Sequence, residues 1–453
     1  MGRIMRLSGA EASWSLTEAA NEPFFNLVLR YVFAPYFAGT LAMSAGQGAS
    51  AWAFAVGAGG LAIALLAPLL GAIADSGARL KPWLGTVAVV AFLASASLWF
   101  AAPGGSLWPV AFAVFLGIVA VELMNQFSNA FLPMVTARDR MGLLSGLAFG
   151  FSQLAGIAVL LIMLWASRQP PAFLAAVPHG TDRLAGPLAA AAIVIFLLPF
   201  LLITPDRQPK PGQRPASVSR GLSELKDTLR EAWADRDMRL FLIGRMFAAD
   251  GMAVVFAFGA VLAAATFGWD SGSLAVFGLV ITVFGAAGGF LAGLLDRRLG
   301  TKRLLLAGLL LLVLGAISVL ATDATRLLGV PTGVALGVPL GSPQEQGFLA
   351  SGAVIALGAA FALSAMRAMM AGLAPPEKIA SYFGLFAFVG KATAFVGPFL
   401  VGVLARETGS LRPGIGIAVV FLSIGFAATL ALRAPKAPVA GASASGHAAS
   451  PPD

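Results

Sequence analysis

Charged residues within apolar stretches are the side chains best able to do chemistry in this chain. An ionisable group at the centre of a membrane helix costs at least about 2.5 to 3.5 kcal/mol, so each should face protein or a water-filled cavity. The charged residues within or beside such stretches are Glu18, Glu22, Glu122, Asp250, Arg30, Arg245, Arg367 and Lys391. This set is formally neutral, as paired burial requires. It predicts either a polar cavity that binds a solute or a coupling proton, or fixed ion pairs that lock helices together.

Three of these acids belong to two polar stripes at helical spacing. The first stripe repeats every four residues, on one side of a helix that begins before Pro23, and consists of Glu18, Glu22, Asn26 and Arg30. The second repeats at three and four residues and consists of Glu122, Asn125, Gln126 and Asn129. Lipid would not tolerate a continuous polar face, so the second stripe must look inward.

The charges differ in how well their positions suit binding. A coupling carboxylate must take up a proton when desolvated and release it when a basic partner approaches. Glu122 suits this role best, because it lies mid-span with only amides nearby in sequence. We expect Arg30 or Lys391 to meet an anionic group and Asp250 to be a further candidate. Arg245 and Arg367 are weaker candidates, because they lie closer to the side predicted to be cytoplasmic.

The composition predicts the environment in which these charges act. Of 453 residues, 58% are hydrophobic and only 11% are charged, whereas a soluble domain carries about 25% charged residues. So few polar groups cannot cover the surfaces of soluble domains, and the chain is therefore predicted to be a polytopic membrane protein.

The chain has no cysteine and two histidines, so no metal or cofactor is expected. HExxH and GxSxG motifs are absent and Lys391 does not fit a phosphate-binding loop, so we expect no enzyme.

Twelve apolar stretches approach the length of about 20 residues that a membrane-spanning helix needs. The first six are 23–44, 50–74, 83–102, 107–132, 143–167 and 186–204. The second six are 240–267, 272–295, 304–322, 350–373, 381–405 and 413–432. About 21 of the 30 Lys and Arg fall on the side that holds both termini, which are therefore predicted to be cytoplasmic. This orientation accounts for the net charge of +9 without nucleic-acid binding.

The stretches divide the chain into two halves. We predict an N-terminal six-helix half over 1–205, a cytoplasmic linker over 206–238, a C-terminal six-helix half over 239–433 and a disordered tail over 434–453. Within the linker, apolar residues at helical spacing predict an amphipathic helix that lies on the membrane surface; they are Leu222, Leu225, Leu229 and Trp233.

A short motif occurs in both halves. GAIADSGARLK, from Gly71 to Lys81, and GLLDRRLGTKR, from Gly293 to Arg303, each follow the second span of their half. Each places an aspartate at the membrane edge ahead of glycine and basic residues. Six plus six helices with matching loops indicate duplicated halves, and substrates of such folds bind near the midplane between them.

The repeated motif resembles the signature of the major facilitator superfamily, and this resemblance covers nearly the whole chain. A finer resemblance is to the branch that includes the vacuolar amino-acid effluxer, an autophagy-linked permease of fungi. The residues that carry it are Trp14, Ala20, Asn21, Pro35, Tyr36, Phe37, Asn129 to Pro133, Asp250, Gly251, Phe383, Gly384, Gly390, Lys391, Gly397 and Pro398. The chain departs from the branch where a substrate would touch, at Thr17 to Ala19, Glu22, Met134 and Met366.

The resemblance also implies how the halves are gated. Asp75 and Arg79 would form a cytoplasmic latch, closed in one state and released in the other. Asp296, with Arg297 and Arg303, would be a weaker second copy. The alternative is that these charges only set the topology. The resemblance further implies that the first helix starts near Trp14, whereas hydropathy alone starts it at Pro23.

These observations together predict an all-α, twelve-helix secondary transporter that rocks two halves around a midplane site. The expected substrate is a small polar or zwitterionic solute, with amino acids first because of the resemblance, and the expected driving force is a proton gradient. We expect a monomer in the bacterial inner membrane with no nucleic-acid partner. Efflux of amphiphilic cations or drugs, and a non-transporting receptor or scaffold, are the alternatives.

Overall fold

The computed structural model describes residues 7–41, 45–76, 79–208, 218–269, 271–337 and 339–433. This part of the chain is nearly all helical, and its only strands are β1 (Arg326–Leu327) and β2 (Val330–Pro331), which pair in an antiparallel hairpin. Ten helices in it are long and apolar enough to cross a membrane. The fold is therefore the predicted all-α membrane bundle.

Five of the ten spans come from the first half of the sequence and contain α3 (Ala45–Ser76), α4 (Lys81–Ser97), α5 (Leu107–Ala130), α7 (Met141–Arg168) and α10 (Ala185–Ile203). The other five are α12 (Arg236–Phe267), α13 (Ser271–Leu299), α14 (Thr301–Ala321), α15 (Pro343–Leu373) and α18 (Arg412–Leu430). Short helices join them: η4 (Leu98–Phe100), α6 (Leu132–Val135), η5 (Arg138–Arg140), α8 (Ala172–Ala175), α9 (Gly180–Arg183) and η6 (Pro376–Lys378).

The first predicted span is helical but not one continuous helix. It consists of α1 (Gly9–Ser15), η1 (Glu18–Ala20), η2 (Phe24–Tyr31), α2 (Phe33–Tyr36) and η3 (Phe37–Leu41), of which η2 and η3 are π-helices. The segment begins at Gly9, where Ser8 and Glu11 form a capping box, so the start near Trp14 is confirmed and the start at Pro23 is wrong. Prolines interrupt regular helices because they lack an amide hydrogen, and two lie here, at Pro23 and Pro35.

The eleventh predicted span is also interrupted. It consists of α16 (Ile379–Val389) and α17 (Val396–Thr408), joined by turns over 390–395. α16 ends at its C-cap residue, Gly390. Pro398 has no amide hydrogen, so it cannot donate the hydrogen bond that would extend α17 toward its N-terminus. The prediction of continuous helices over 23–44 and 381–405 is therefore wrong, and the second break places Lys391 in a turn.

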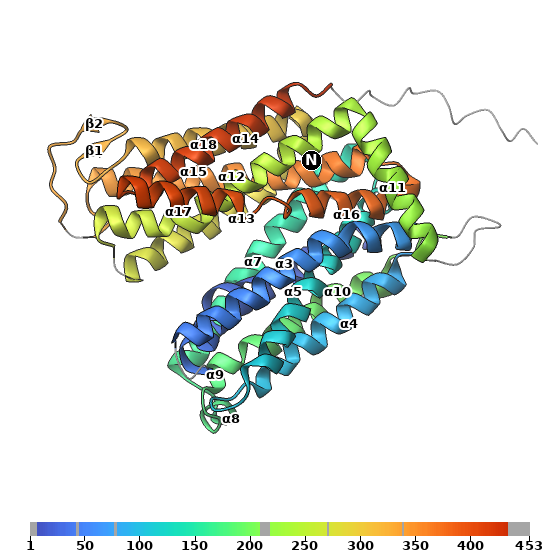
Figure 1. Cartoon of the computed structure of the whole chain (residues 1–453), viewed down its shortest axis with the longest axis horizontal. Coiled ribbons are helices and arrows are strands. Elements are labelled where there is room, and N and C mark those ends of the chain that lie inside the picture. The colour runs from blue at the N-terminus through green and yellow to red at the C-terminus, as the bar shows by residue number, and fades with distance from the viewer. Residues whose placement is uncertain are drawn as a thin grey trace, which may run out of the picture.

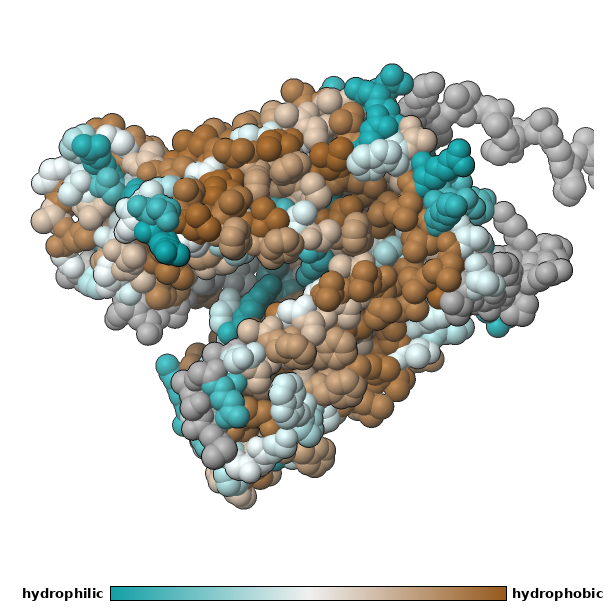
Figure 2. Space-filling view, viewed as in Figure 1, coloured by the Kyte–Doolittle hydropathy of each residue, from teal (hydrophilic) through white to brown (hydrophobic). Residues whose placement is uncertain are grey.

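The two sets of helices form two groups that meet at one end and diverge at the other (Figure 1). We call the end with α11 (Val218–Ala234) the linker end, and the end with α8, α9 and the β1–β2 hairpin the loop end. The space-filling view shows a cleft between the groups at the loop end, with hydrophilic residues on its walls and mostly hydrophobic outer faces (Figure 2). The structure is thus open toward the loop end.

Glycines let the groups approach closely at the linker end. α7 packs against α13, where a Cβ on Gly289 would lie 2.6 Å from the backbone nitrogen of Gly150. α3 packs against α16, where Gly71 faces the carbonyl oxygen of Ala380. Small residues at helix crossings allow backbones to pack tightly within a membrane. The two crossings close the linker end.

The predicted amphipathic helix of the linker is confirmed as α11. Gly221 of this helix packs against Ile73 of α3, and Ala232 is also buried. Leu222, Leu229 and Trp233 are instead exposed. That outward apolar stripe suits a helix lying on a membrane surface, which stays a prediction. The tail over 434–453 lies outside the described residues.

Candidate functional site

A cavity lies between the two groups of helices and is built from α5, α12 and the region of α16 and its break. It opens to solvent, and the empty space within it, open solvent included, is about 400 Å³. Its lining residues are Glu122, Asn125, Gln126, Asn129, Arg245, Phe383, Phe386, Ala387, Gly390 and Lys391. The second polar stripe of the sequence thus looks inward, as predicted, and meets Lys391.

Glu122 and Lys391 form an ion pair across this cavity. The Nζ of Lys391 lies 2.7 Å from Oε1 of Glu122. The Glu122 side chain is 14% exposed and that of Lys391 is 40% exposed, so water reaches the lysine more readily. Only amides lie near Glu122 in sequence, and the distant turn at 390–395 brings a cation to it. The pair joins the two groups of helices across the cavity.

The three amides of the stripe differ in role. The side-chain amide of Gln126 donates to the carbonyl oxygens of Ala67, at 2.8 Å, and Ala380, at 3.2 Å. It therefore ties α3 to α16 across the groups. Asn129 donates to the side-chain oxygen of Asn125 at 3.0 Å. Asn125 and Asn129 thus leave polar atoms to the cavity, whereas Gln126 holds the helices together.

Arg245, a weaker candidate in the sequence, also lines the cavity. Its guanidinium lies over the ring of Phe386, 4.0 Å from the centroid, and its Nη1 donates to the sulfur of Met366 at 3.6 Å. Arg245 is nine residues into α12, which places it about 13 Å along the helix. This distance from the start of α12 can be counted from the sequence, and it was the signal that could have placed Arg245 in the cavity.

Glu18 and Arg367 form a fixed ion pair between the two groups. Both guanidinium nitrogens Nη1 and Nη2 donate to the carboxylate, the first at 2.6 Å. Arg367 is buried in α15, and Glu18 lies in η1. This bidentate pair matches the prediction that some of the charges lock helices together.

Glu22, Asn26 and Arg30 form a separate cluster that does not line the cavity. Nη1 of Arg30 donates to Oε1 of Glu22 at 3.2 Å and to Oδ1 of Asn26 at 2.9 Å. The three lie on one side of the first span, as their spacing predicted. Asn26 packs against α7, where Gly156 leaves room for its amide. The Arg30 side chain is 52% exposed, so this pair is open to water.

Asp250 is buried in α12 and does not line the cavity either. Its Oδ1 has no hydrogen-bond partner within the described part of the chain. The next residue, Gly251, packs against Leu422 of α18. Asp250 therefore lies outside the lining of this cavity, and any coupling role for it stays a prediction.

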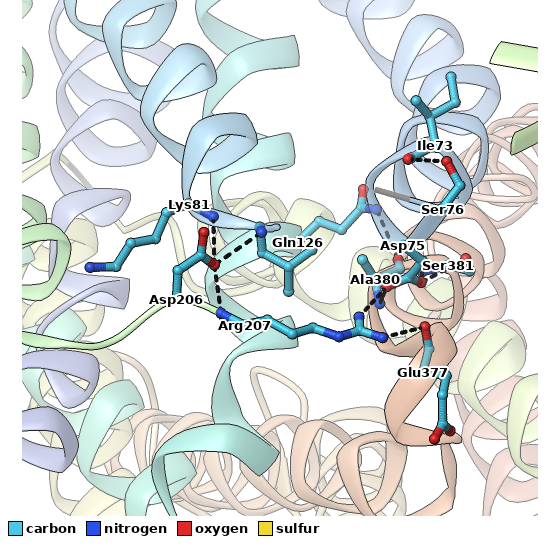
Figure 3. Close-up of polar contacts among 11 residues, drawn as sticks. Ile73, Asp75, Ser76, Lys81, Gln126, Asp206, Arg207, Glu377, Ala380 and Ser381 are labelled. Atoms are coloured by element: carbon cyan, nitrogen blue, oxygen red, sulfur yellow. Dashed lines mark hydrogen bonds and ion pairs between the residues drawn. The ribbon is translucent and has the colours of Figure 1, made fainter. Parts of the chain in front are cut away.

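Asp75 of α3 contacts the first turn of α16 at the linker end (Figure 3). Its carboxylate accepts from the backbone nitrogen of Ser381 at 2.7 Å and from the Ser381 hydroxyl at 2.8 Å, at the first turn of α16. Arg207 pairs with it at 3.0 Å and also donates to the carbonyl oxygen of Glu377 at 2.8 Å. A carboxylate at a helix N-terminus is favoured by the helix dipole. We call Asp75, Arg207, Glu377 and Ser381 the clasp.

The cation of the clasp is not the one that the motif indicated. Arg79 is exposed, and Arg207, from the segment after α10, takes the place beside Asp75. Arg207 is therefore the partner of Asp75 in the described part of the chain, and a gating role for Arg79 stays a prediction.

Asp296 occupies a similar position in the other half. It is buried at the end of α13, and its carboxylate fills the space where a side chain on Gly142 of α7 would stand. Arg297 and Arg303 are exposed. Each aspartate of the repeated motif thus meets the start of a helix from the opposite group, and the arginines after Asp296 face outward.

Comparisons with known proteins identify the family. The model of the family described as vacuole effluxer Atg22 like matches residues 47–441. The chain belongs to this Atg22-like family. The uncharacterized MFS-type transporter YxiO of Bacillus subtilis is 24% identical over 434 residues, which cover 93% of this chain and 94% of that protein. Autophagy-related protein 22 of Yarrowia lipolytica is 28% identical over 205 residues, 45% of this chain and 33% of that protein.

Solved structures show the same fold. The major facilitator superfamily (MFS) proton:xylose symporter bound to 6-bromo-6-deoxy-D-glucose superposes with a TM-score of 0.69 at 13% identity, over 93% of this chain and 94% of that chain. A bacterial homologue of the iron transporter ferroportin in an outward-facing state gives 0.68 at 13% identity, over 93% and 98%. The Atg22-like chain is therefore an integral membrane protein of a transporter superfamily and not an enzyme.

The clasp of this Atg22-like protein gives a first prediction. We expect Arg207→Gln to lower the apparent melting temperature of the purified protein, because a charge-assisted hydrogen bond contributes about 1.5 to 3 kcal/mol. Arg79→Gln is the matched control, since both arginines lie at the linker end but only Arg207 contacts Asp75. Melting is followed by fluorescence of the tryptophans. Equal melting temperatures for the two variants would remove Arg207 from the clasp.

Proposed function

We propose that this Atg22-like chain is a proton-coupled secondary transporter of a small zwitterionic solute, with amino acids as the first class to test. The observation that carries the proposal is the ion pair of Glu122 and Lys391, which crosses a solvent-open cavity between the two groups of helices. A charge pair of this kind within membrane-spanning helices marks a substrate or ion path by default. The family description, vacuole effluxer Atg22 like, supports transport as the activity.

The ion pair offers a way to couple protons to solute. Protonation of Glu122 would break its attraction to Lys391 and leave the ammonium group free for an anionic group. Conversely, a bound solute would compete for Lys391 and change how readily Glu122 holds a proton. Because the pair joins the two groups of helices, either event also changes what holds the groups together. This reciprocity is what coupled transport requires.

The arrangement of the groups supports alternating access. The clasp, Gln126 and the glycine crossings close the linker end, while the cleft opens at the loop end (Figure 2). If both termini are cytoplasmic in a bacterial inner membrane, as we propose from the basic loops, this state faces outward. Release of the clasp would open the linker end as the groups rock about the cavity.

The charge of the cavity bears on the alternative substrates. Its lining carries one acid, Glu122, and two bases, Arg245 and Lys391. A surplus of positive charge disfavours amphiphilic cations, although Phe383 and Phe386 supply aromatic surface. We therefore put zwitterionic solutes ahead of cationic drugs.

Reconstitution tests the proposal. The purified protein is placed in liposomes, a pH gradient is imposed, and uptake of a radiolabelled amino-acid panel is measured beside a panel of lipophilic cations. We expect amino-acid accumulation that collapses when a protonophore removes the gradient. Accumulation of cations alone would favour drug efflux, and no flux of any solute under either gradient direction would favour a receptor or scaffold.

A further inference from the structure

Arg245 is a cation whose attractive neighbour, Glu122, is already paired with Lys391. Within the described part of the chain it forms no ion pair, whereas Glu122 pairs with Lys391 and Glu18 pairs with Arg367. Burying an uncompensated charge is costly, so membrane proteins pair such groups or expose them to a cavity. Arg245 lines the cavity, which therefore leaves one position for an anion.

The surroundings of Arg245 fix its guanidinium while leaving it unpaired. One face lies on the ring of Phe386, with 4.0 Å between the guanidinium carbon and the ring centroid. Nη1 contacts only the weak acceptor Met366 sulfur, and Nε is buried with no hydrogen-bond partner. An arginine held flat on an aromatic ring is pre-organised for a planar or branched oxyanion, because its nitrogens form a rigid fork.

The neighbouring chain leaves space beside this fork. Gly390 lies next to it, and a Cβ added there would come within 3.2 Å of Nη2 of Arg245. Glycine therefore keeps a side chain out of the space between the arginine and the turn that carries Lys391. The three charged lining residues sum to one positive charge, counting Glu122 as negative and Arg245 and Lys391 as positive. One bound oxyanion would make the cavity neutral.

We propose that Arg245 binds an oxyanion group of the solute, a carboxylate or a phosphate, against Phe386 and beside the Glu122–Lys391 pair. This inference rests on the proposed function, because it places the anionic end of the transported solute against Arg245, next to the Lys391 ammonium group that protonation of Glu122 would free. The group that decides binding is then the oxyanion, and the ammonium group of a zwitterion is secondary at this position.

Matched small molecules test the assignment. The full chain in lipid nanodiscs is titrated with four compounds: leucine, 4-methylpentanoate, leucinamide and inorganic phosphate. Compared with leucine, 4-methylpentanoate keeps the carboxylate but lacks the amine. Leucinamide keeps the amine but lacks the carboxylate. Binding is followed by tryptophan fluorescence and by the shift in melting temperature. We expect an oxyanion to bind the wild-type chain and leucinamide to bind at least about tenfold more weakly than leucine. Binding of phosphate alone would identify a phosphate site, and binding of 4-methylpentanoate a carboxylate site.

Three variants locate the binding group. We expect Arg245→Gln to weaken oxyanion binding at least about tenfold, and Arg245→Lys to recover part of it, because lysine keeps the charge but loses the fork. Arg406→Gln, an exposed arginine of α17, is the control and should bind like the wild type. Should Arg245→Gln fail to fold, Arg245→Lys and the wild-type comparison of leucine with leucinamide still decide the question.

The outcomes separate this inference from the proposed function. If no oxyanion binds the wild type, if leucinamide binds as well as leucine, or if a folded Arg245 variant binds like the wild type, the anion site is wrong. If oxyanions bind through Arg245 but none crosses a liposome membrane, the anion site stands and the transport proposal fails.

Discussion

The variant Glu122→Gln is expected to abolish gradient-driven accumulation of solute while leaving passive exchange. The amide cannot take up or release a proton, so the coupling step is lost, and Lys391 also loses its partner at 2.7 Å. Loss of one charge-assisted contact costs about 1.5 to 3 kcal/mol, which corresponds to roughly 10- to 100-fold in solute affinity if the contact orders the site. The measurement compares uptake under a pH gradient with counterflow of labelled solute without one, in the same liposomes.

Two further variants separate coupling from structure. Glu407→Gln changes an exposed acid of α17 in the same way and should accumulate solute like the wild type. The double variant Glu122→Gln with Lys391→Gln removes both charges, so it should regain stability without regaining coupling, because replacing both members of a pair is less costly than stranding one. Accumulation of solute against its gradient by Glu122→Gln alone would show that the coupling proton binds elsewhere.

Local pattern was enough to predict ten of the spans and one wall of the cavity. The three- and four-residue spacing from Glu122 to Asn129 specifies one face of a helix, and that face does line the cavity. Helical spacing from Leu222 to Trp233 likewise predicted α11. Such features depend on the periodicity of one helix and on the cost of polar groups in lipid, both of which are properties of the sequence itself.

Pairing across the chain was not predictable in the same way. Glu18 and Arg367 are 349 positions apart, and nothing in either segment specifies the other. The motif indicated Asp75, yet its cation, Arg207, comes from 132 positions away. The breaks that place Lys391 in a turn depend on how Gly390 and Pro398 are accommodated by neighbouring helices, whereas hydropathy reports only an apolar stretch.

The glycine crossing at the linker end gives the prediction that bears most directly on conformation. A Cβ on Gly71 would meet the carbonyl oxygen of Ala380 and come within 2.8 Å of the Gln126 amide. The Ala380 oxygen belongs to the backbone, so α16 itself must move away from α3. We therefore expect Gly71→Ala to open the linker end and close the loop end, with a large loss of transport.

Spin labels measure this change, and they attach only to introduced cysteines because the chain contains none of its own. Phe173→Cys and Val330→Cys place labels on exposed loops of the two groups at the loop end. Distances between the labels should shift to shorter values in Gly71→Ala. Gly60→Ala is the control, since Gly60 lies in the same helix with nothing within 4 Å of an added Cβ.

Both substitutions raise helix propensity by the same amount, about 1 kcal/mol, so a difference between them must come from the contact with α16. Identical distance distributions in the two variants would mean that the crossing of α3 and α16 does not set the state of the protein. A shift confined to Gly71→Ala would instead show that helix contact at the linker end and separation at the loop end are two parts of one movement. In that case the small residues at the crossing, and not the clasp alone, determine which side of the cavity is open.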